Sequence, residues 1–570
     1  EDLSLSLYEL GDKGVRALAS SKHLKNLTTL KLNSVKEEGA KVGDEGARAL
    51  AESNRLSDLK KLDLCHNRIG DEGARALAES EHLPHLEVLN LRGNRIGDEG
   101  VRALAESKRF SRLKVLNLFG NEMSLEGALT LVGSKHLRGL EELCLGALRI
   151  PGGQHGHYSD QRKVGKEIAL GLASSDVWSK LKRLRLRGCF LGNDGVCTLA
   201  ASQVLGSLEV LELSNNGIDI EGVHALVASE YLKTLKMLCL GSNRIDAGGV
   251  RVLADSQVLR TLEILDLSLN FIGDEGVCAL ADSAFLCGLR ELSLREGGIG
   301  DEGVCALAAS EVLRTLEVLN LRANAIGSEG VCALAGSEVM VRLGDLNLSH
   351  NEIGDDGVFA LASSEALKTL EALDLSSNVI GDEGFSALFS SEHLGCLSDL
   401  DLSSNRIKSV ARTVEFESLK NLAFLDLGLN DLGENDVSHL FESAYLANLK
   451  LLWVGDNECL DPTFEEVRPW EQDAPLHYRT RALAEMCDDE PELESIPRLL
   501  ELLKEEPREG ALSLWTLRVL EEWDAGEHGL EVLEGCRYER EAWEELRVKL
   551  MARGKMLRAQ RQTLEDGLFG

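Results

Sequence analysis

The sequence repeats one phrase at a spacing of 27 residues. Asn67, Asn94 and Asn121 each end a segment of the form L-x-x-L-x-L-x-x-N, and a stretch rich in Gly, Ala and Leu follows each of them. The register extends from Leu3 to Val454. A period between about 20 and 50 residues is typical of a solenoid, in which each repeat buries its apolar face against its neighbours. The repeat therefore predicts an elongated fold and directs the search for function to an exposed surface.

Each repeat is predicted to contain a strand, a turn and a helix. Leu86, Leu89 and Leu91 alternate as in a strand with one buried face. Asn94 follows in a turn, where a buried amide is suited to hydrogen-bond free backbone groups. Asp98 begins the expected helix, where a carboxylate is a good N-cap. The recurrent Asp-Glu pairs are accordingly interpreted as helix caps rather than metal sites.

The turn position is Asn in most repeats. In register, its occupants are Tyr8, Val35, Asn67, Asn94, Asn121, Leu148, Cys189, Asn216, Asn243, Asn270, Gly297, Asn324, Asn351, Asn378, Asn405, Asn430 and Asn457. Leu148 and Gly297 depart from the pattern, and we expect local irregularity in the turn at both places.

The repeats resemble leucine-rich repeats of the ribonuclease-inhibitor type over about four fifths of the chain. Similar repeats occur in the sensor arms of NOD-like receptors, in the activating protein of the Ran GTPase and in bacterial GALA effectors. The resemblance implies an α/β solenoid, a horseshoe with a parallel concave sheet and convex helices. It also implies that a Cys is tolerated at the turn position, as at Cys189.

The chain is predicted to divide near Asn457. About 17 repeats occupy residues 1–457, and six of the eight prolines lie in residues 458–570, where helical patterns indicate a small all-α region. That region either caps the exposed end of the solenoid or binds a partner. The basic residues of its last helix would dock on the acidic repeats or on a partner. Because the chain begins inside a repeat without Met, we expect a preceding cap or domain to be missing.

Two insertions interrupt the period, near residues 34–41 and 150–164. In repeat proteins, insertions of this kind often serve the binding face. The second one contains His155, His157 and Tyr158. It is interpreted as a partner-contact loop or as a neutral insertion. The two histidines with nearby Asp160 are a weaker candidate for a metal site, because a Gly-rich loop does not hold ligands in place.

Three arginines on one predicted strand are candidate binding residues. Arg183, Arg185 and Arg187 occupy the positions between the inward leucines, so they face the concave side. Register places Arg183 beside Glu142 and Arg185 beside Glu212, which predicts two cross-strand ion pairs. Arg187 faces no carboxylate and is the better candidate for a carboxylate of a partner.

An acidic column is predicted on later strands. Asp374, Asp401 and Asp426 occupy one position in successive repeats, with Asp399 nearby. Like charges in adjacent strands repel each other, by roughly 1 kcal/mol per pair in water. The column therefore indicates either a basic surface on a partner or an ordinary solvated face. Two further residues, Asp266 and Asp345, extend the acidic character, and no calcium-binding loop is present among these carboxylates.

An aromatic group closes the predicted sheet. Phe424, Leu451 and Trp453 fall on its last two strands. An exposed Trp beside a Phe is typical of an interface hot spot, although a neighbouring cap commonly covers such residues. Both interpretations remain open from the sequence.

The formal net charge of −33 disfavours nucleic acid and anionic membranes as partners. No apolar run reaches the roughly 20 residues that a membrane-spanning helix needs. Cys278, Cys305 and Cys332 share one helix position in consecutive repeats, and neighbouring helices lie about 8–10 Å apart, too far for a disulfide. Reduced thiols are typical of a cytoplasmic protein.

No catalytic motif stands out, and no cofactor is expected. The Cys487-Asp488-Asp489 segment is similar to the Cys-acid-acid motif of bacterial leucine-rich-repeat ubiquitin ligases, but its carboxylates raise rather than lower a thiol pKa. The prediction is a non-catalytic scaffold, a regulator, inhibitor or sensor arm that binds a basic protein surface on its concave face. The resemblance implies two alternatives, a GTPase-activating regulator and the target-recognition subunit of a ubiquitin ligase or effector.

Overall fold

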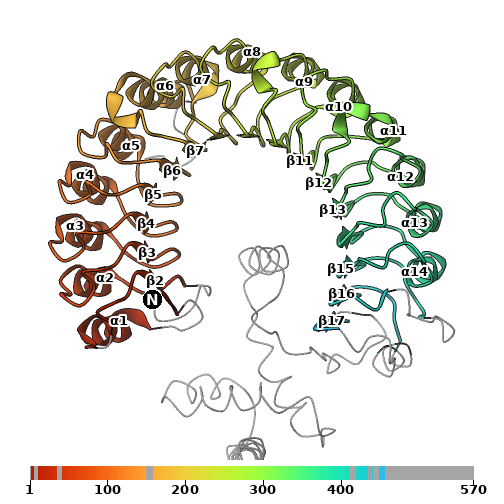
Figure 1. Ribbon diagram of the computed structural model, residues 1–570, viewed down its shortest axis with the longest axis horizontal. Helices are drawn as coiled ribbons and strands as arrows, with labels where there is room; N and C mark the ends of the chain where they lie inside the picture. Colours follow the sequence, from red (N-terminus) through yellow and green to blue (C-terminus); the bar gives the residue numbers. More distant parts are fainter. Residues whose placement is uncertain are drawn as a thin grey trace, which may run out of the picture.

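The repeats form an open arc, with strands on its inner wall and helices on its outer wall (Figure 1). The computed structural model describes residues 2–5, 10–22, 24–34, 41–148, 158–410, 419–433, 436, 440, 449–455 and 457, without the side chains of 158–162. The predicted α/β solenoid with a parallel concave sheet is confirmed for this part of the chain. The expected all-α region at 458–570 lies outside the described residues, as do Tyr8 and Val35.

Within the described residues, seventeen short strands make one parallel sheet. They are β1 (Asp2–Ser4), β2 (Thr29–Lys31), β3 (Lys61–Asp63), β4 (Val88–Asn90), β5 (Val115–Asn117), β6 (Glu142–Gly146), β7 (Arg183–Arg187), β8 (Val210–Glu212), β9 (Met237–Cys239), β10 (Ile264–Asp266), β11 (Glu291–Ser293), β12 (Val318–Asn320), β13 (Asp345–Asn347), β14 (Ala372–Asp374), β15 (Asp399–Asp401), β16 (Phe424–Asp426) and β17 (Leu451–Trp453). Each strand pairs with those of the adjacent repeats, Leu opposite Leu, as Leu89 lies opposite Leu62 and Leu116.

Helices and a few single 3-10 turns cover the outer side of the sheet. They are α1 (Gly11–Ser20), α2 (Asp44–Ala51), α3 (Asp71–Glu79), α4 (Asp98–Glu106), α5 (Leu125–Val132), α6 (Tyr158–Ser174), η1 (Asp176–Trp178), α7 (Gly192–Ala200), α8 (Ile220–Val227), α9 (Ala247–Ala254), η2 (Gln257–Leu259), α10 (Gly273–Ala281), α11 (Asp301–Ala309), η3 (Glu311–Leu313), α12 (Ser328–Ala335), α13 (Asp355–Ala362) and α14 (Asp382–Phe389). Every described helix is too short or too polar to cross a bilayer.

One continuous apolar core runs between the sheet and the helices. Leu89 and Leu91 of the strand segment are fully buried, and so are Val101 and Leu104 of α4. The equivalent Leu346 near the other end is also fully buried. The predicted alternation on the strands and the apolar face of the helices are therefore confirmed.

The turn asparagines connect each repeat to the one before it. The Asn94 side chain donates to the carbonyl of Leu64 in the preceding repeat (2.9 Å) and to that of Leu91 in its own (3.0 Å). Its oxygen accepts the N–H of Ile69, again in the preceding repeat (3.0 Å). Asn270 repeats this pattern with a side chain that is almost completely buried. The predicted role of the buried amide is confirmed.

The carboxylates of the Asp-Glu pairs cap a different helix from the one predicted. Asp98 was expected to cap α4, but Gly97 precedes α4 and Asp98 is the first residue of the helix itself. The helix is capped instead by Asp71 of the preceding repeat, whose Oδ1 accepts the N–H groups of Gly97 (2.7 Å) and Gly100 (2.9 Å). A Cβ on Gly100 would lie 2.7 Å from that oxygen, which explains the glycine at this position.

Serines make a further link between neighbouring repeats. The Ser80 hydroxyl donates to the carbonyl of Ala51 at the end of the preceding helix (2.5 Å), and Ser229 donates to Ala200 in the same way (2.5 Å). Most repeats from Ser53 to Ser391 share this contact. Each serine satisfies a carbonyl that a helix end leaves without an intrahelical partner.

An irregularity appears beside Leu148, one of the two turn positions where we expected it. Leu148 is buried as an apolar residue, and the strands beside it, β6 and β7, are longer than the others, at five residues each. At Gly297, the backbone carbonyl accepts the N–H of Gly273 (3.0 Å), just as the carbonyl of Asn216 accepts the N–H of Gly192 (3.0 Å), so this contact does not depend on the missing Asn. Both glycine donors have a positive φ, +56° and +57°, a conformation that favours glycine.

Replacing Asp71 with Ala tests the cap between repeats. We expect Asp71→Ala to lower the free energy of unfolding by about 1–2 kcal/mol, because the first turn of α4 loses its acceptor. Glu72→Ala is the matched control, since the Glu72 side chain is 57% exposed and pairs only with surface arginines. Denaturant unfolding measures both variants. Equal effects of the two substitutions would contradict this assignment of the cap.

Candidate partner-binding surface

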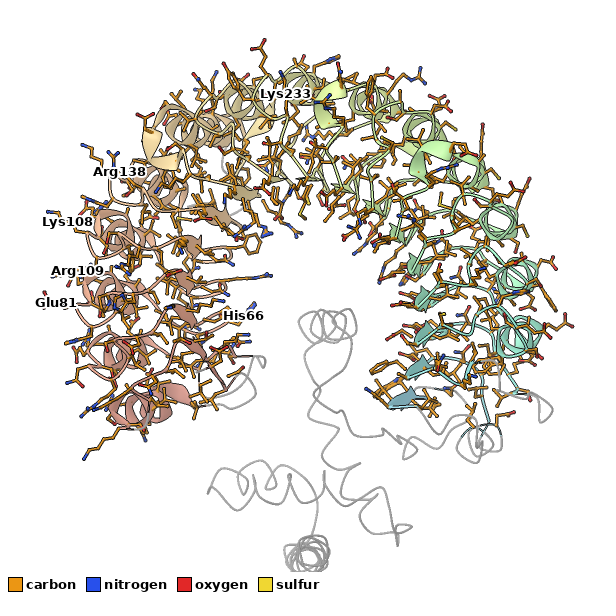
Figure 2. The ribbon with its side chains drawn as sticks, viewed as in Figure 1. His66, Glu81, Lys108, Arg109, Arg138 and Lys233 are labelled. Carbon is orange, nitrogen blue, oxygen red and sulfur yellow. The ribbon has the colours of Figure 1, made fainter. Side chains whose placement is uncertain are left out.

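Two outward-facing positions on each strand from β2 to β17 build most of the inner wall of the arc. We call them the first and second columns, and Figure 2 shows their side chains projecting from the strands into the open side. The first column is Thr29, Lys61, Val88, Val115, Glu142, Arg183, Val210, Met237, Ile264, Glu291, Val318, Asp345, Ala372, Asp399, Phe424 and Leu451. The second column is Lys31, Asp63, Asn90, Asn117, Cys144, Arg185, Glu212, Cys239, Asp266, Ser293, Asn320, Asn347, Asp374, Asp401, Asp426 and Trp453.

The second column contains many Asp and Asn residues for a local structural reason. Asp374 Oδ1 accepts the N–H of Ser376, two residues on (3.0 Å), while the N–H groups of Leu375 and Ser377 bond the next strand. Asn347, at the same position, accepts the N–H of Ser349 in the same way (3.0 Å). The side chain thus accepts a hydrogen bond from the one backbone N–H in this segment that does not bond the neighbouring strand.

The acidic column follows the predicted register but is less open than expected. Asp374, Asp401 and Asp426 lie opposite one another on β14, β15 and β16. However, Asp399 and Asp401 are only 4% and 3% exposed, whereas the sequence had indicated a solvated face or an open docking surface. Asp401 accepts the N–H and the hydroxyl of Ser403 at 2.9 and 2.6 Å. The column therefore has a structural role in the strand ends, and Asp266 shares it through the N–H of Ser268 (2.9 Å).

The three arginines of β7 lie as register predicted. Arg183 Nε is 2.6 Å from Glu142 Oε2, and Arg185 Nε is 3.5 Å from Glu212 Oε2. Arg185 also reaches Glu142, at 3.2 Å, so that one carboxylate joins two arginines. Arg187 lies opposite Gly146, is exposed, and has no carboxylate partner within the part of the chain that the structure describes.

A second unpaired cation lies three strands away from Arg187. Arg92 is exposed on the segment after β4, and its guanidinium lies 5.2 Å from the ring centre of Phe119 in the next repeat. A cation over an aromatic ring is worth about 0.5–1 kcal/mol at an exposed site. The contact holds Arg92 in place without neutralising its charge.

The aromatic group at the end of the sheet is partly covered. Phe424 is 3% exposed and packs against Ala423 and Leu451, while Trp453 is half-buried. The burial of the Phe424 ring favours the covered group over the interface hot spot, the two interpretations that the sequence left open. For Trp453, both predictions remain open: an interface hot spot, or a residue that a neighbouring cap covers.

Several predicted residues lie outside the described part of the chain. They are His155, His157, the Tyr158 side chain, Cys487 and the basic residues of the last predicted helix. The contact-loop and metal interpretations of 150–164 consequently remain predictions.

Two exposed apolar side chains were not predicted from the sequence. Phe271 is 87% exposed and Leu269 is 38% exposed, on either side of the buried Asn270. The signal was available, because the residue after the turn asparagine is polar or Gly in many other repeats, such as Arg95 and Gly217. These two side chains lie in the turn between β10 and α10.

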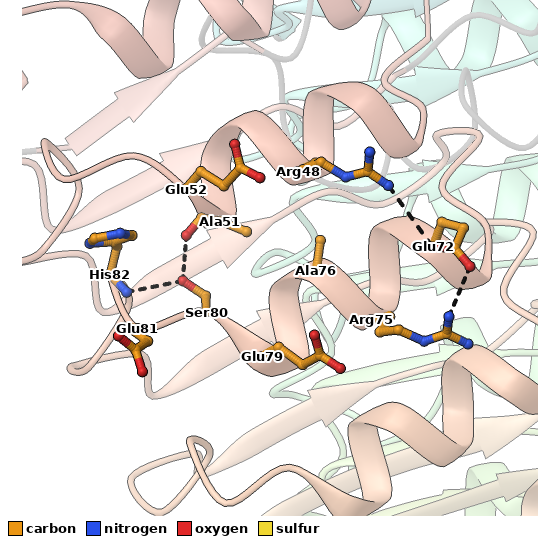
Figure 3. A pocket seen from close by; sticks show the side chains of 10 residues that line it. All are labelled: Arg48, Ala51, Glu52, Glu72, Arg75, Ala76, Glu79, Ser80, Glu81 and His82. Atoms are coloured by element: carbon orange, nitrogen blue, oxygen red, sulfur yellow. Dashed lines mark hydrogen bonds and ion pairs between the residues drawn. The ribbon is translucent and has the colours of Figure 1, made fainter.

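A hollow of about 330 Å³ lies on the outer wall between α2 and α3. Arg48 and Arg75 both approach Glu72 along it, at 3.9 and 2.9 Å (Figure 3). Ser80 joins Ala51 at its other end (Figure 3). The groups are paired with one another, so the hollow follows from the spacing of the helices and presents no converging acid, base and nucleophile.

The family comparison agrees with this geometry. A family model described as Leucine Rich repeat matches nine stretches of the chain, at residues 55–78, 82–105, 112–132, 207–227, 258–281, 287–308, 312–335, 343–362 and 366–389. The nine matched stretches are leucine-rich repeats. No curated protein matches it in sequence.

Several solved structures are similar to this chain. An internalin of Listeria monocytogenes is 21% identical, with 67% of this chain and 93% of that chain covered and a TM-score of 0.38. A leucine-rich repeat protein of Leptospira interrogans is 20% identical, covering 79% and 94%, with a TM-score of 0.33. The structure of the yeast Rad7 and Elc1 complex gives 15% identity, 68% and 83% coverage, and a TM-score of 0.44.

The cysteines of the described repeats are free thiols in two environments. Cys144 and Cys239 lie in the second column, where burial, together with nearby carboxylates, raises the pKa of each thiol to about 12. Cys287 and Cys396 are exposed on the surface. Only a thiolate attacks an alkylating reagent, so the two groups should differ in reactivity.

Alkylation at pH 8 measures this difference. A pKa of about 12 leaves roughly one thiol in ten thousand ionised, against roughly one in four for an ordinary thiol with a pKa near 8.5. We expect iodoacetamide to label Cys287 and Cys396 at least a hundredfold faster than Cys144 and Cys239, by peptide mass spectrometry. Labelling in guanidinium is the control, where all four should react alike. Comparable rates in the native protein would show that the second column is not closed around its thiols.

Proposed function

We propose that this protein is a non-catalytic scaffold that binds a protein partner along the inner wall of its arc. One observation carries the proposal: the wall presents two columns of side chains from parallel strands, held at a fixed spacing and with no helix of the repeats packed over them. Such a wall offers a large area of ordered groups. Association of proteins commonly needs about 800 Å² on each partner.

The charges support a protein as the partner. The net charge of −33 works against nucleic acid, whose phosphates would be repelled, and against anionic membranes. Asp374 and Asp426 of the acidic column are suited to a basic surface on the partner. The free thiols support a reducing compartment, and we place the protein in the cytoplasm as a regulator, inhibitor or sensor arm.

Site-specific photo-crosslinking tests the use of the inner wall. A benzoylphenylalanine at Met237, in the first column on β9, should yield one discrete covalent adduct with another protein in cells that make this protein. The matched control places the same group at Arg251, which is exposed on α9 in the same repeat. Adducts from position 251 alone, or from neither position, would contradict the proposal.

A further inference from the structure

The inner wall carries its charges in two separate sectors. We call β2–β7 the basic sector and β8–β17 the acidic sector. Cations of the basic sector are Lys31, Lys61, Arg92, Arg183, Arg185 and Arg187, and its only carboxylates in the two columns are Asp63 and Glu142. A chain with a large negative net charge thus has a positive region on its inner wall.

Ion pairs involve two arginines of the basic sector and leave two others without a carboxylate among the described residues. Glu142 is engaged by both Arg183 and Arg185, and Arg185 also engages Glu212 at the boundary with the acidic sector. Arg92 and Arg187 have no carboxylate within ion-pair distance among the described residues. Both are exposed and available to a negatively charged group of a partner.

In the acidic sector, the charged residues of the two columns are all carboxylates. From β8 to β17, neither column contains a Lys or Arg, while both contain carboxylates. These include Glu212, Asp266, Glu291, Asp345, Asp374 and Asp426. At the position that Arg92 and Arg187 occupy in their repeats, this sector has two cations. Arg295 is paired with Glu296 at 2.7 Å, and Arg322 lies 3.1 Å from Nε2 of His350.

The outer wall lacks this separation. On its helices, opposite charges are close neighbours, as in the pairs Arg102–Glu99 (2.8 Å) and Lys166–Asp194 (3.2 Å). The division into sectors is therefore a property of the inner wall and does not follow from composition alone. Charge of one sign gathered on one surface steers a partner and fixes its orientation.

We infer that the inner wall binds a protein segment of two-part charge, with carboxylates at one end and Lys or Arg at the other. The acidic end of the segment lies against β4–β7, beside Arg92 and Arg187. Its basic end lies against β13–β16, beside Asp374 and Asp426. The inference rests on the proposed use of the inner wall and adds the chemistry and the direction of the partner.

The spacing of strands sets the length of such a segment. Strands lie about 4.8 Å apart, so the seven steps from β7 to β14 cover roughly 34 Å. An extended chain spans this distance with about ten residues, and a helix needs about 22. Charges at the two ends of a segment of this length reach both sectors at once.

A synthetic peptide tests the inference without knowledge of the natural partner. Its sequence is six glutamates, a spacer of about eleven prolines and six lysines, because a polyproline spacer extends about 3.1 Å per residue. Fluorescence anisotropy at low salt measures its affinity for the full chain. We expect binding at least tenfold tighter than that of six glutamates or six lysines alone, since two linked contacts raise the effective concentration. A spacer of two prolines should remove this gain.

The basic sector is tested by charge reversal, with a control that changes the net charge by the same amount. The double variant Arg92→Glu, Arg187→Glu should bind the peptide of six glutamates at least tenfold more weakly than the wild-type chain does. The control, Arg102→Glu with Arg251→Glu, makes the same change in net charge on the outer wall and should leave that peptide nearly unaffected. Because the whole protein repels anions, binding of this peptide to the wild-type chain is itself diagnostic.

The acidic sector is tested by Asp→Asn changes, because Asn occupies the same position in other repeats and keeps the oxygen that caps the strand end. The affinity for the full peptide should fall at least fivefold in the triple variant Asp266→Asn, Asp374→Asn, Asp426→Asn. The control, Glu52→Gln, Glu79→Gln and Glu106→Gln, neutralises as many exposed carboxylates on the outer wall. Circular dichroism confirms that the variants remain folded.

Crosslinking from each end of the peptide tests its direction. A photo-reactive group on the glutamate end should attach to β4–β7, and one on the lysine end to β13–β16. The inference is overturned if six glutamates do not bind, if both sets of variants act like their controls, or if the ends attach in the reverse order. The experiment at Met237 is independent of these outcomes, so that a partner bound there with no two-part charge would leave the proposed function standing.

Discussion

The hydrogen bonds of the turn asparagines are the constraint on which the rest of the arc depends. A solenoid has no contacts between distant repeats, so each junction must be fixed by its two neighbours. Asn94 does this with an amide that reaches the backbone of both repeats, and Asp71 and Ser80 add links at the start and end of the helices. A buried amide left without partners would cost about 1–3 kcal/mol, so each site favours one register strongly.

A fixed register turns the inner wall into an ordered array of side chains. Since Leu lies opposite Leu in every pair of strands, the residues beside each Leu also fall into straight columns. Their neighbours then decide their chemistry. Arg185 is shared between two carboxylates, whereas Arg187, two residues on, meets only a glycine across the strand and keeps its charge for a partner. The division of the wall into a basic and an acidic sector is a consequence of this order.

Much of this could be predicted from the sequence, because the fold is set by periodicity. The 27-residue spacing gave the sheet, the helices and the pairing of Arg183 with Glu142, since register alone places those two side chains together. Side-chain contacts that join one repeat to the next were harder to predict from the sequence. Asp98 looks like the cap of its own helix in a linear reading, yet its carboxylate reaches Ser124 of the next repeat (2.8 Å). The burial of Asp399 and Asp401 depends on their whole surroundings, which the alternation of strand residues does not describe.

Amide hydrogen exchange of the native protein tests the role of the asparagines most directly. The N–H groups of Ile69 and Ile245, which donate to Asn94 and Asn270, lie in turns that would otherwise exchange as fast as surface loops. We predict that they exchange as slowly as the amides of α3 and α9 in the same repeats. Fast exchange at both isoleucines, with the helices still protected, would show that the asparagine bonds do not hold the repeats in register.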